Sequence, residues 1–225
     1  MRPLLVLAGL LLVAGCSAGD GGATPSESGT TGPGPSSSAA PSASGSSTAA
    51  ASDPCSLLTA AEVARIAGGT GQSAEPGTLA GQPICQWKGA GDTVAQVISL
   101  RASDWAASLP QVIAGVKSAG AGSDPEGLAR LEKASGIVER GGRVADGEAC
   151  GLFSDLLTIG GQAPGSDRSI QAYPSSKDAQ SLTAQLCTDG RFTSLAIVSP
   201  SGLTTPLPLD EVSAAAASAH QRSLG

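Results

Sequence analysis

The chain has 225 residues, a formal net charge of −6 and only 2% aromatic residues, so its core must be built mainly from Leu, Val, Ile and Ala. The negative charge and the lack of any basic cluster exclude a nucleic-acid partner, because phosphate backbones would be repelled. Histidine occurs once and the cysteines are far apart, whereas zinc sites need such ligands at short spacing, so we expect no metal and no cofactor.

The first 15 residues are typical of a secretory signal peptide. Arg2 gives a positive start, and residues 4–13 form an apolar run shorter than the roughly 20 residues that span a bilayer. Residues 13–16, Val-Ala-Gly-Cys, resemble the lipobox of bacterial lipoproteins. The resemblance implies diacylglyceryl transfer to the Cys16 sulfur and cleavage before it. We therefore expect a protein lipid-anchored at Cys16 on the extracytoplasmic face of the cell membrane. The alternatives are cleavage elsewhere and an uncleaved anchor.

Residues 16–52 are predicted to be the lipidated cysteine and a disordered tether. After Cys16 this stretch holds Ser, Ala, Gly, Thr and Pro with one Asp and one Glu, and it has too little apolar area to offset the entropy of ordering. A coil of this kind spans about 30–36 Å on average. A glycosylated stalk is the alternative. The remaining residues, 53–225, are long enough for a single globular domain.

The five cysteines divide into one for lipid and four for disulfides. Once Cys16 is assigned to the anchor, Cys55, Cys85, Cys150 and Cys187 remain. An even set outside the cytoplasm indicates disulfides, and four cysteines allow three connectivities. We predict Cys55–Cys85 and Cys150–Cys187, because each pair brackets one half of the domain.

The first half of the domain is predicted to hold two helices around one hairpin. Thr59 and Glu62 have the spacing of a capping box, which starts a helix. Pro110 either breaks the second helix or starts its main part. The predicted elements are a helix over 59–67, strands over 84–87 and 93–101, and a helix over 105–118.

The second half is predicted to continue this mixture of hairpins and helices. Its predicted elements are a helix from 124 to about 133, a short strand around 137–138, an antiparallel hairpin of 150–159 and 169–173, a helix over 175–187, a strand over 192–199 and a closing helix capped by Asp210. Because the strands come as hairpins without regular βαβ alternation, we predict an α+β fold. It has a single antiparallel sheet of hairpins, helices packed mainly on one face, and two disulfides.

One local motif resembles a known family. Residues 53–59 read Asp-Pro-Cys-Ser-Leu-Leu-Thr, Glu62 follows, and residues 85–87 read Cys-Gln-Trp. This pattern resembles the domain of unknown function family 3558, a family of secreted actinobacterial lipoproteins. Cys150 and Cys187 resemble the family's second cysteine pair, and the chain departs from the family pattern after Cys187. The resemblance implies the lipid anchor and the disulfides, and it implies no activity.

Trp87 and Trp105 are the candidate binding residues. Aromatic residues are scarce in this chain, so an exposed ring would mark a recognition surface, whereas the alternative is that both rings pack in the core. We predict a binding or accessory domain for an envelope partner, either an envelope protein or a wall component, and no enzymatic activity.

The sequence leaves two alternative functions open. The first is a carrier of a lipid or small-molecule ligand in a cavity between sheet and helices. The second is a hydrolase that works without histidine, for which Ser176 and Lys177 are a formal candidate pair. The single histidine, His220, is predicted to be a solvated residue near a helix end, which disfavours a Ser-His-Asp mechanism.

Overall fold

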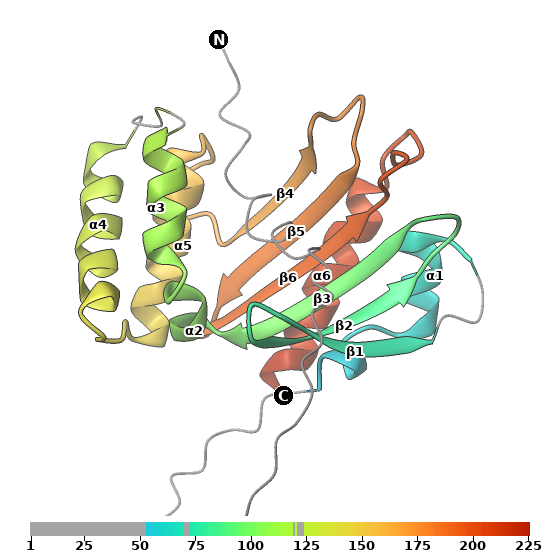
Figure 1. Ribbon diagram of the computed structural model, residues 1–225, viewed down its shortest axis with the longest axis horizontal. Helices are drawn as coiled ribbons and strands as arrows, with labels where there is room; N and C mark the ends of the chain where they lie inside the picture. The colour runs from blue at the N-terminus through green and yellow to red at the C-terminus, as the bar shows by residue number, and fades with distance from the viewer. Residues whose placement is uncertain (1–52, 70–72, 119, 121–123) are drawn as a thin grey trace, which may run out of the picture.

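The computed structural model describes residues 53–225, except 70–72, 119 and 121–123. Cys16, the predicted signal peptide and the predicted tether lie outside the described residues. The described strands form one antiparallel sheet in the order β1-β2-β3-β6-β5-β4 (Figure 1). The strands are β1 Ala74–Leu79, β2 Gln82–Lys88, β3 Val94–Arg101, β4 Arg168–Tyr173, β5 Ser181–Thr188 and β6 Arg191–Val198.

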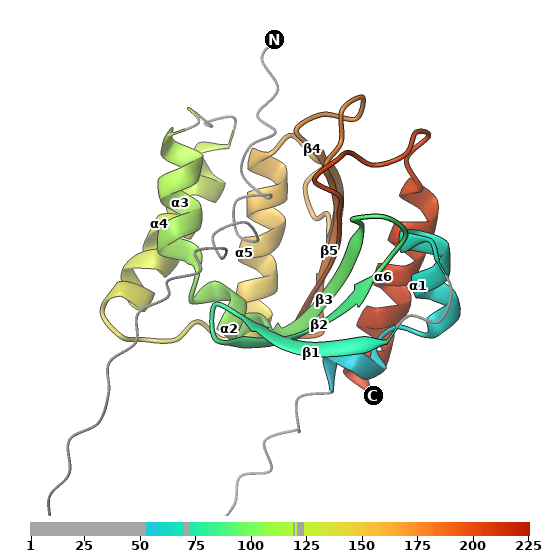
Figure 2. The same ribbon diagram turned by 45° about the vertical axis from the view of Figure 1, so that its right-hand side comes forward.

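The helices form two groups around this sheet. They are α1 Ala60–Ala67, α2 Ala102–Ala106, α3 Leu109–Ser118, α4 Pro125–Glu139, α5 Asp146–Ile159 and α6 Leu209–Leu224, and a 3-10 turn over Pro54–Ser56 precedes them. Figures 1 and 2 show α1 and α6 behind one face of the sheet, while α2–α5 gather beside one end of it. The predicted α+β class with an antiparallel sheet of hairpins and two disulfides is confirmed. Within the described residues, no helix combines the length and apolar character that membrane crossing requires.

The predicted capping box starts α1. The Glu62 carboxylate accepts a hydrogen bond from the Thr59 backbone N–H at 2.7 Å, and the Thr59 hydroxyl accepts one from the Glu62 N–H at 3.2 Å. Arg222 of α6 pairs with the same carboxylate at 2.9 Å. Burial acts to raise the pKa of Glu62, but hydrogen bonds from Arg222 and Thr59 outweigh it and lower the pKa to about 2. The ionised pair therefore ties the last helix to the first.

Strand β1 was not predicted from sequence. It contains Pro76 and Gly77, which rarely occur in central strands, and nearly all of it is exposed. It lies at the edge of the sheet and pairs only with β2. Because neither of its faces is buried, it lacks the alternation of apolar and polar residues by which a strand is recognised in a sequence. Ala80 and Gly81 both have positive φ, 49° and 78°, as the two-residue hairpin turn between these strands requires.

Residues 150–159 are helical, so the predicted strand there is wrong. They belong to α5, in which Ala149, Leu152 and Phe153 are buried together on one side. Positions three and four residues apart share a helix face, which explains this burial. Asp146 and Glu148 lie in the first turn, where their charges favour the helix dipole.

Two further predictions in this half are also wrong. The short strand around 137–138 lies inside α4, which continues to Glu139. The helix over 175–187 is replaced by a loop and β5, in which Leu182, Ala184 and Leu186 are buried beneath α6. Leu182 and Leu186 also have helical spacing, and only the pairing of β5 with β4 and β6 decides for the strand.

The remaining predicted elements are present with changed bounds. The closing helix is α6, but the predicted cap at Asp210 is wrong, because α6 begins at Leu209 after Pro208 and Asp210 lies in its first turn. Strands β2 and β3 form the predicted hairpin, and the strand over 192–199 is β6. The helix over 105–118 is divided into α2 and α3, and Pro110 stands in the first turn of α3, so it starts the main part of that segment.

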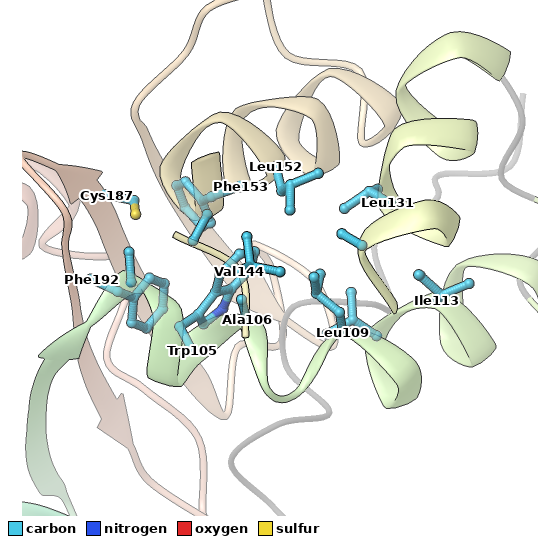
Figure 3. Packing of buried hydrophobic residues seen from close by; sticks show 14 of the residues in the cluster. Trp105, Ala106, Leu109, Ile113, Leu131, Val144, Leu152, Phe153, Cys187 and Phe192 are labelled. Atoms are coloured by element: carbon cyan, nitrogen blue, oxygen red, sulfur yellow. The ribbon is translucent and has the colours of Figure 1, made fainter. Parts of the chain in front are cut away.

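The buried residues form two separate clusters. One lies between the sheet and α1 with α6. The other lies among α2–α5 and reaches the sheet through Leu100, Cys187 and Phe192. Figure 3 shows the second cluster, in which Trp105 stacks on Phe192 at 5.6 Å between ring centroids and meets Phe153 edge-on at 5.5 Å. This aromatic contact joins the helical group to the sheet.

Candidate functional site

Both predicted disulfides are present. Cys55–Cys85 joins the first 3-10 turn to β2, and Cys150–Cys187 joins α5 to β5. Their Cα–Cα distances of 4.9 and 5.2 Å lie in the ordinary range for such bridges. Two disulfides in one small domain are typical of an oxidising, extracytoplasmic compartment.

The two tryptophans lie in the core and not on a surface. Trp87 is 3% exposed and packs in the same cluster as Cys85, whereas Trp105 is 6% exposed within the aromatic contact. Of the alternatives that the sequence left open, the structure therefore places both rings in the core. Neither ring is available to a partner while the domain stays folded.

His220 is buried, so its prediction as a solvated residue is wrong. Helix α6 packs its alanine-rich side on the sheet, and His220 lies on that side with 1% exposure. Its Nε2 lies 2.8 Å from the Thr188 hydroxyl and its Nδ1 lies 2.9 Å from the Thr193 hydroxyl. A neutral imidazole donates to one hydroxyl and accepts from the other, so both ring nitrogens are satisfied without a charge. This arrangement serves the fold.

We expect stability to fall as the pH drops below about 6.5. Burial lowers the pKa of His220, and the nearby charges of Asp189 and Arg191 act in opposite directions. The unfolded chain therefore binds a proton that the folded chain does not, and the loss approaches about 1.4 kcal/mol per pH unit.

Because His220 is the only histidine, His220→Gln serves as the matched variant. Chemical denaturation between pH 7 and pH 5 measures the effect. The free energy of unfolding should decrease toward pH 5 in the parent and stay nearly flat in the variant. Parallel pH profiles for the two proteins would show that folding does not lower the pKa of His220.

The described residues bring no catalytic constellation together. Ser176 and Lys177 are both exposed in the loop before β5, where the Ser175 hydroxyl accepts a hydrogen bond from the Lys177 backbone. Glu62 is the one buried carboxylate in the described part of the chain, and it is paired with Arg222. In the same residues, no group of three His, Cys, Asp or Glu side chains has the arrangement of a metal site.

Two cavities in the described domain are candidate ligand pockets. One of about 260 Å³ is lined by residues of β4, β5 and α6, among them Arg168, Gln185 and Ser213. The other, of about 230 Å³, lies between the end of α1 and the loop before α6. Both are smaller than the roughly 300–1,000 Å³ of typical ligand pockets, and polar groups contribute to their lining. They do not favour the carrier alternative.

The sheet face opposite α1 and α6 carries two rows of mainly polar side chains. Paired residues on neighbouring antiparallel strands point to the same face and lie side by side. The first row, from β4 to β2, is Ser169, Gln185, Ser194, Ile98 and Ile84, and the second row is Gln171, Thr183, Ala196, Gln96 and Gln86. We call these two rows the polar face. The next row, Leu100, Phe192 and Cys187, is where α2–α5 meet the sheet.

Two hydroxyls of the polar face are buried without a partner. Ser194 and Ser169 are 3% and 6% exposed, and neither Oγ has a hydrogen bond. Native proteins pair nearly all such groups, because an unsatisfied buried hydroxyl costs about 1–3 kcal/mol. Ser194 also lines a small hollow in this face with Ile84, Gln96 and Ile98. The polar face therefore holds the two buried side-chain hydroxyls that have no hydrogen-bond partner within the described domain.

Sequence reasoning missed this face for a local reason. Gln96 alternates with Val97 in a predicted strand, so the polar side of β3 could be read from the sequence. Thr183 and Gln185 were assigned to a helix, in which they would not share a face with Gln96. The polar character of the sheet becomes visible only when β5 and β6 are aligned by their register.

These features define an antiparallel α+β domain that is cross-linked by two disulfides and carries an uncharged polar face. The family model described as "Protein of unknown function (DUF3558)" matches residues 11–158, and the chain belongs to this family. The matched segment includes Cys16, Cys55, Cys85 and Cys150, whereas Cys187 and strands β4–β6 lie beyond it. Comparisons with curated proteins and with solved structures found no match to this chain.

Proposed function

We propose that this protein is a lipoprotein, anchored through Cys16 to the extracytoplasmic face of the membrane, whose domain binds a component of the cell envelope. The single observation that carries the binding role is the pair of unpartnered hydroxyls on the polar face, Ser169 and Ser194. Each unsatisfied buried hydroxyl lowers stability, and two of them on one face of the sheet support a role for that face beyond the fold.

Three observations support the anchor. The apolar run and the Val-Ala-Gly-Cys sequence precede a polar stretch without large apolar residues. The family match begins at residue 11, so it includes the residues leading to Cys16. The two disulfides agree with a domain that folds outside the cytoplasm. With Cys16 lipidated, all five cysteines of the chain have a role.

Binding is favoured over catalysis by the chemistry of the polar face. Its polar members are amides and hydroxyls. The one carboxylate in register with them, Glu75, is paired with Lys88 at 3.4 Å, and His220 lies on the opposite face beneath α6. Amides and hydroxyls recognise a ligand by hydrogen bonds without transferring protons at neutral pH.

The proposal is tested in intact cells of the host with two readouts. The wild-type protein should enter the detergent phase and have an intact mass that includes a diacylglyceryl group on Cys16. Cys16→Ser should abolish the added mass, whereas Thr24→Ala in the predicted tether should retain it. A Cys16→Ser protein that still carries the lipid mass would contradict the anchor.

The second readout is photo-crosslinking at the polar face. A photoreactive amino acid replaces Gln96, which is half-buried on the polar face, or Gln111, which is exposed on α3 and serves as the matched control. We expect a cross-link to an envelope component from position 96 and none from position 111. Equal cross-linking from both positions, or none from position 96, would contradict a binding role for this face.

A further inference from the structure

The edge strand β1 is closed to the addition of another strand. The Gly89 N–H donates to the Thr93 carbonyl at 2.7 Å, and this bond fixes which residues of β2 face β3 and which face β1. By the register of β1 on β2, the backbone groups on the open side of β1 belong to Ala74, Pro76 and Thr78. Proline has no N–H, so the middle position of this edge cannot donate a hydrogen bond. Such a proline protects an edge against further pairing.

The opposite edge strand, β4, carries no such block. The Cys187 N–H donates to the Asp167 carbonyl at 2.9 Å, so the register turns the backbone groups of Arg168, Ile170 and Ala172 away from β5. Each of these residues has an N–H, and in the described part of the chain no hydrogen bond is made to their outward groups. Figure 1 shows β4 as the last strand on the side of the sheet away from β1. This edge is open to one more strand.

The apolar core beneath α6 is incomplete at the same edge. Helix α6 packs on β5 and β6, and Ile170 and Ala172 of β4 are only partly buried against this core. The cavity of about 260 Å³ lies beside them and is lined by Ile170, Ala184 and Leu186 among others. A strand added to β4 would continue the sheet and place apolar side chains over this cavity.

Strand β4 is complementary to a second copy of itself. When two β4 strands pair antiparallel about a two-fold axis at Ile170, Arg168 stands opposite Ala172 of the second copy. The outward backbone groups of both strands then meet each other, and the two Ile170 side chains lie together at the cavities. No two charged side chains of β4 stand opposite each other in this register.

We infer that β4 joins two copies of this chain edge to edge into one continuous sheet. The chain's own residues 17–52 suit the edge less well, because they contain several prolines and no Val, Ile or aromatic residue. The inference goes beyond the proposed function, since it depends neither on the lipid at Cys16 nor on a ligand of the polar face.

Oxidative cross-linking of the full-length chain in intact host cells tests the inference, and it captures a contact as small as one strand pair. Ile170→Cys should form a disulfide-linked dimer, because opposed residues of a hydrogen-bonded antiparallel pair have Cα atoms about 5.5 Å apart. Thr78→Cys on the open side of β1 is the matched control. Thr78 is exposed and Ile170 is half-buried, so random collision would favour the control. We expect at least about tenfold more dimer from position 170.

The register is tested with cysteines on two separately tagged copies in the same cells. Arg168→Cys on one copy and Ala172→Cys on the other should cross-link, because these positions stand opposite each other. Ala172→Cys alone should not cross-link, since its two copies would stand about 14 Å apart along the strands, at about 3.4 Å per residue.

Ile170→Pro gives the edge of β4 the block that Pro76 gives to β1. The N–H that it removes has no partner within the chain, so the variant should keep its far-ultraviolet dichroism. The dimer trapped through Arg168→Cys and Ala172→Cys should fall about tenfold, because a backbone hydrogen bond is lost on both sides of the axis. Ile170→Ala keeps the N–H and should lose less of the dimer. If Ile170→Pro does not fold, the cysteine pairs decide.

The outcomes separate this inference from the proposed function. Equal cross-linking from positions 78 and 170 overturns it, as does a product that joins position 170 to a different protein in place of a dimer. A missing cross-link between the Arg168→Cys and Ala172→Cys copies, or an unchanged dimer in folded Ile170→Pro, overturns it as well. None of these results bears on the lipid mass at Cys16 or on the cross-link from position 96, so the proposed function stands or falls by its own tests.

Discussion

The double variant Cys150→Ser/Cys187→Ser is expected to lose about 4 kcal/mol in free energy of unfolding. The bridge closes a separation of 37 residues, and constraining a loop of this length in the unfolded chain accounts for the estimate. Because the bridge joins α5 to β5, its removal also releases the helical group α2–α5 from one of its attachments to the sheet. Urea denaturation, followed by far-ultraviolet circular dichroism, measures the loss.

The other disulfide provides the matched control for this prediction. Cys55→Ser/Cys85→Ser opens a separation of 30 residues, so its loss in free energy of unfolding should be of nearly the same size. The two variants should differ in where hydrogen exchange accelerates. The first should accelerate exchange in α2–α5, and the second around the 3-10 turn and β2. Identical exchange maps would contradict a local role for either bridge.

Phe192→Ala is expected to reduce the free energy of unfolding by about 3–5 kcal/mol. The ring is 4% exposed and lies within 5.6 Å of the rings of both Trp105 and Phe153, measured between centroids. Its loss leaves a cavity where the helical group meets the sheet (Figure 3). Denaturant unfolding gives the free energy, and the near-ultraviolet dichroism of Trp105 should weaken because its stacking partner is gone.

Tyr173→Ala is the control for removal of an aromatic ring as such. Tyr173 is 45% exposed, so its replacement should change the free energy of unfolding by less than about 1 kcal/mol. A Phe192→Ala variant that is as stable as Tyr173→Ala would mean that the helical group and the sheet do not share one aromatic contact.

The features that sequence reasoning predicted correctly depend on neighbouring residues. The capping box of Thr59 and Glu62 starts α1, and the alternation in β3 marks its two faces. Each feature depends on residues only a few positions apart, because helix caps and strand periodicity are local patterns. The disulfide pairing was also correct, because each pair brackets a segment that folds back on itself.

Short apolar runs were assigned wrongly where two periodicities fit the same residues. Leu182 and Leu186 are compatible with a helix and with a strand, and residues 150–159 carry too few polar positions to separate the two. In the structure, Leu182 joins a strand because β6 offers hydrogen bonds on one side and β4 on the other. Local propensity is weaker than such pairing.

The sequence by itself determined the pairing of the four domain cysteines, the starts of α1 and α4 and the α+β class of this protein. Only the tertiary structure decided that Trp87, Trp105 and His220 are buried, because each packs against residues from distant parts of the chain. The tertiary structure also brought the polar face together, because Ser169, Ser194 and Gln96 lie on one face of the sheet only through the register of their strands. Side chains that are far apart in sequence acquire a common face when non-local hydrogen bonds align their strands, and no local pattern encodes that alignment.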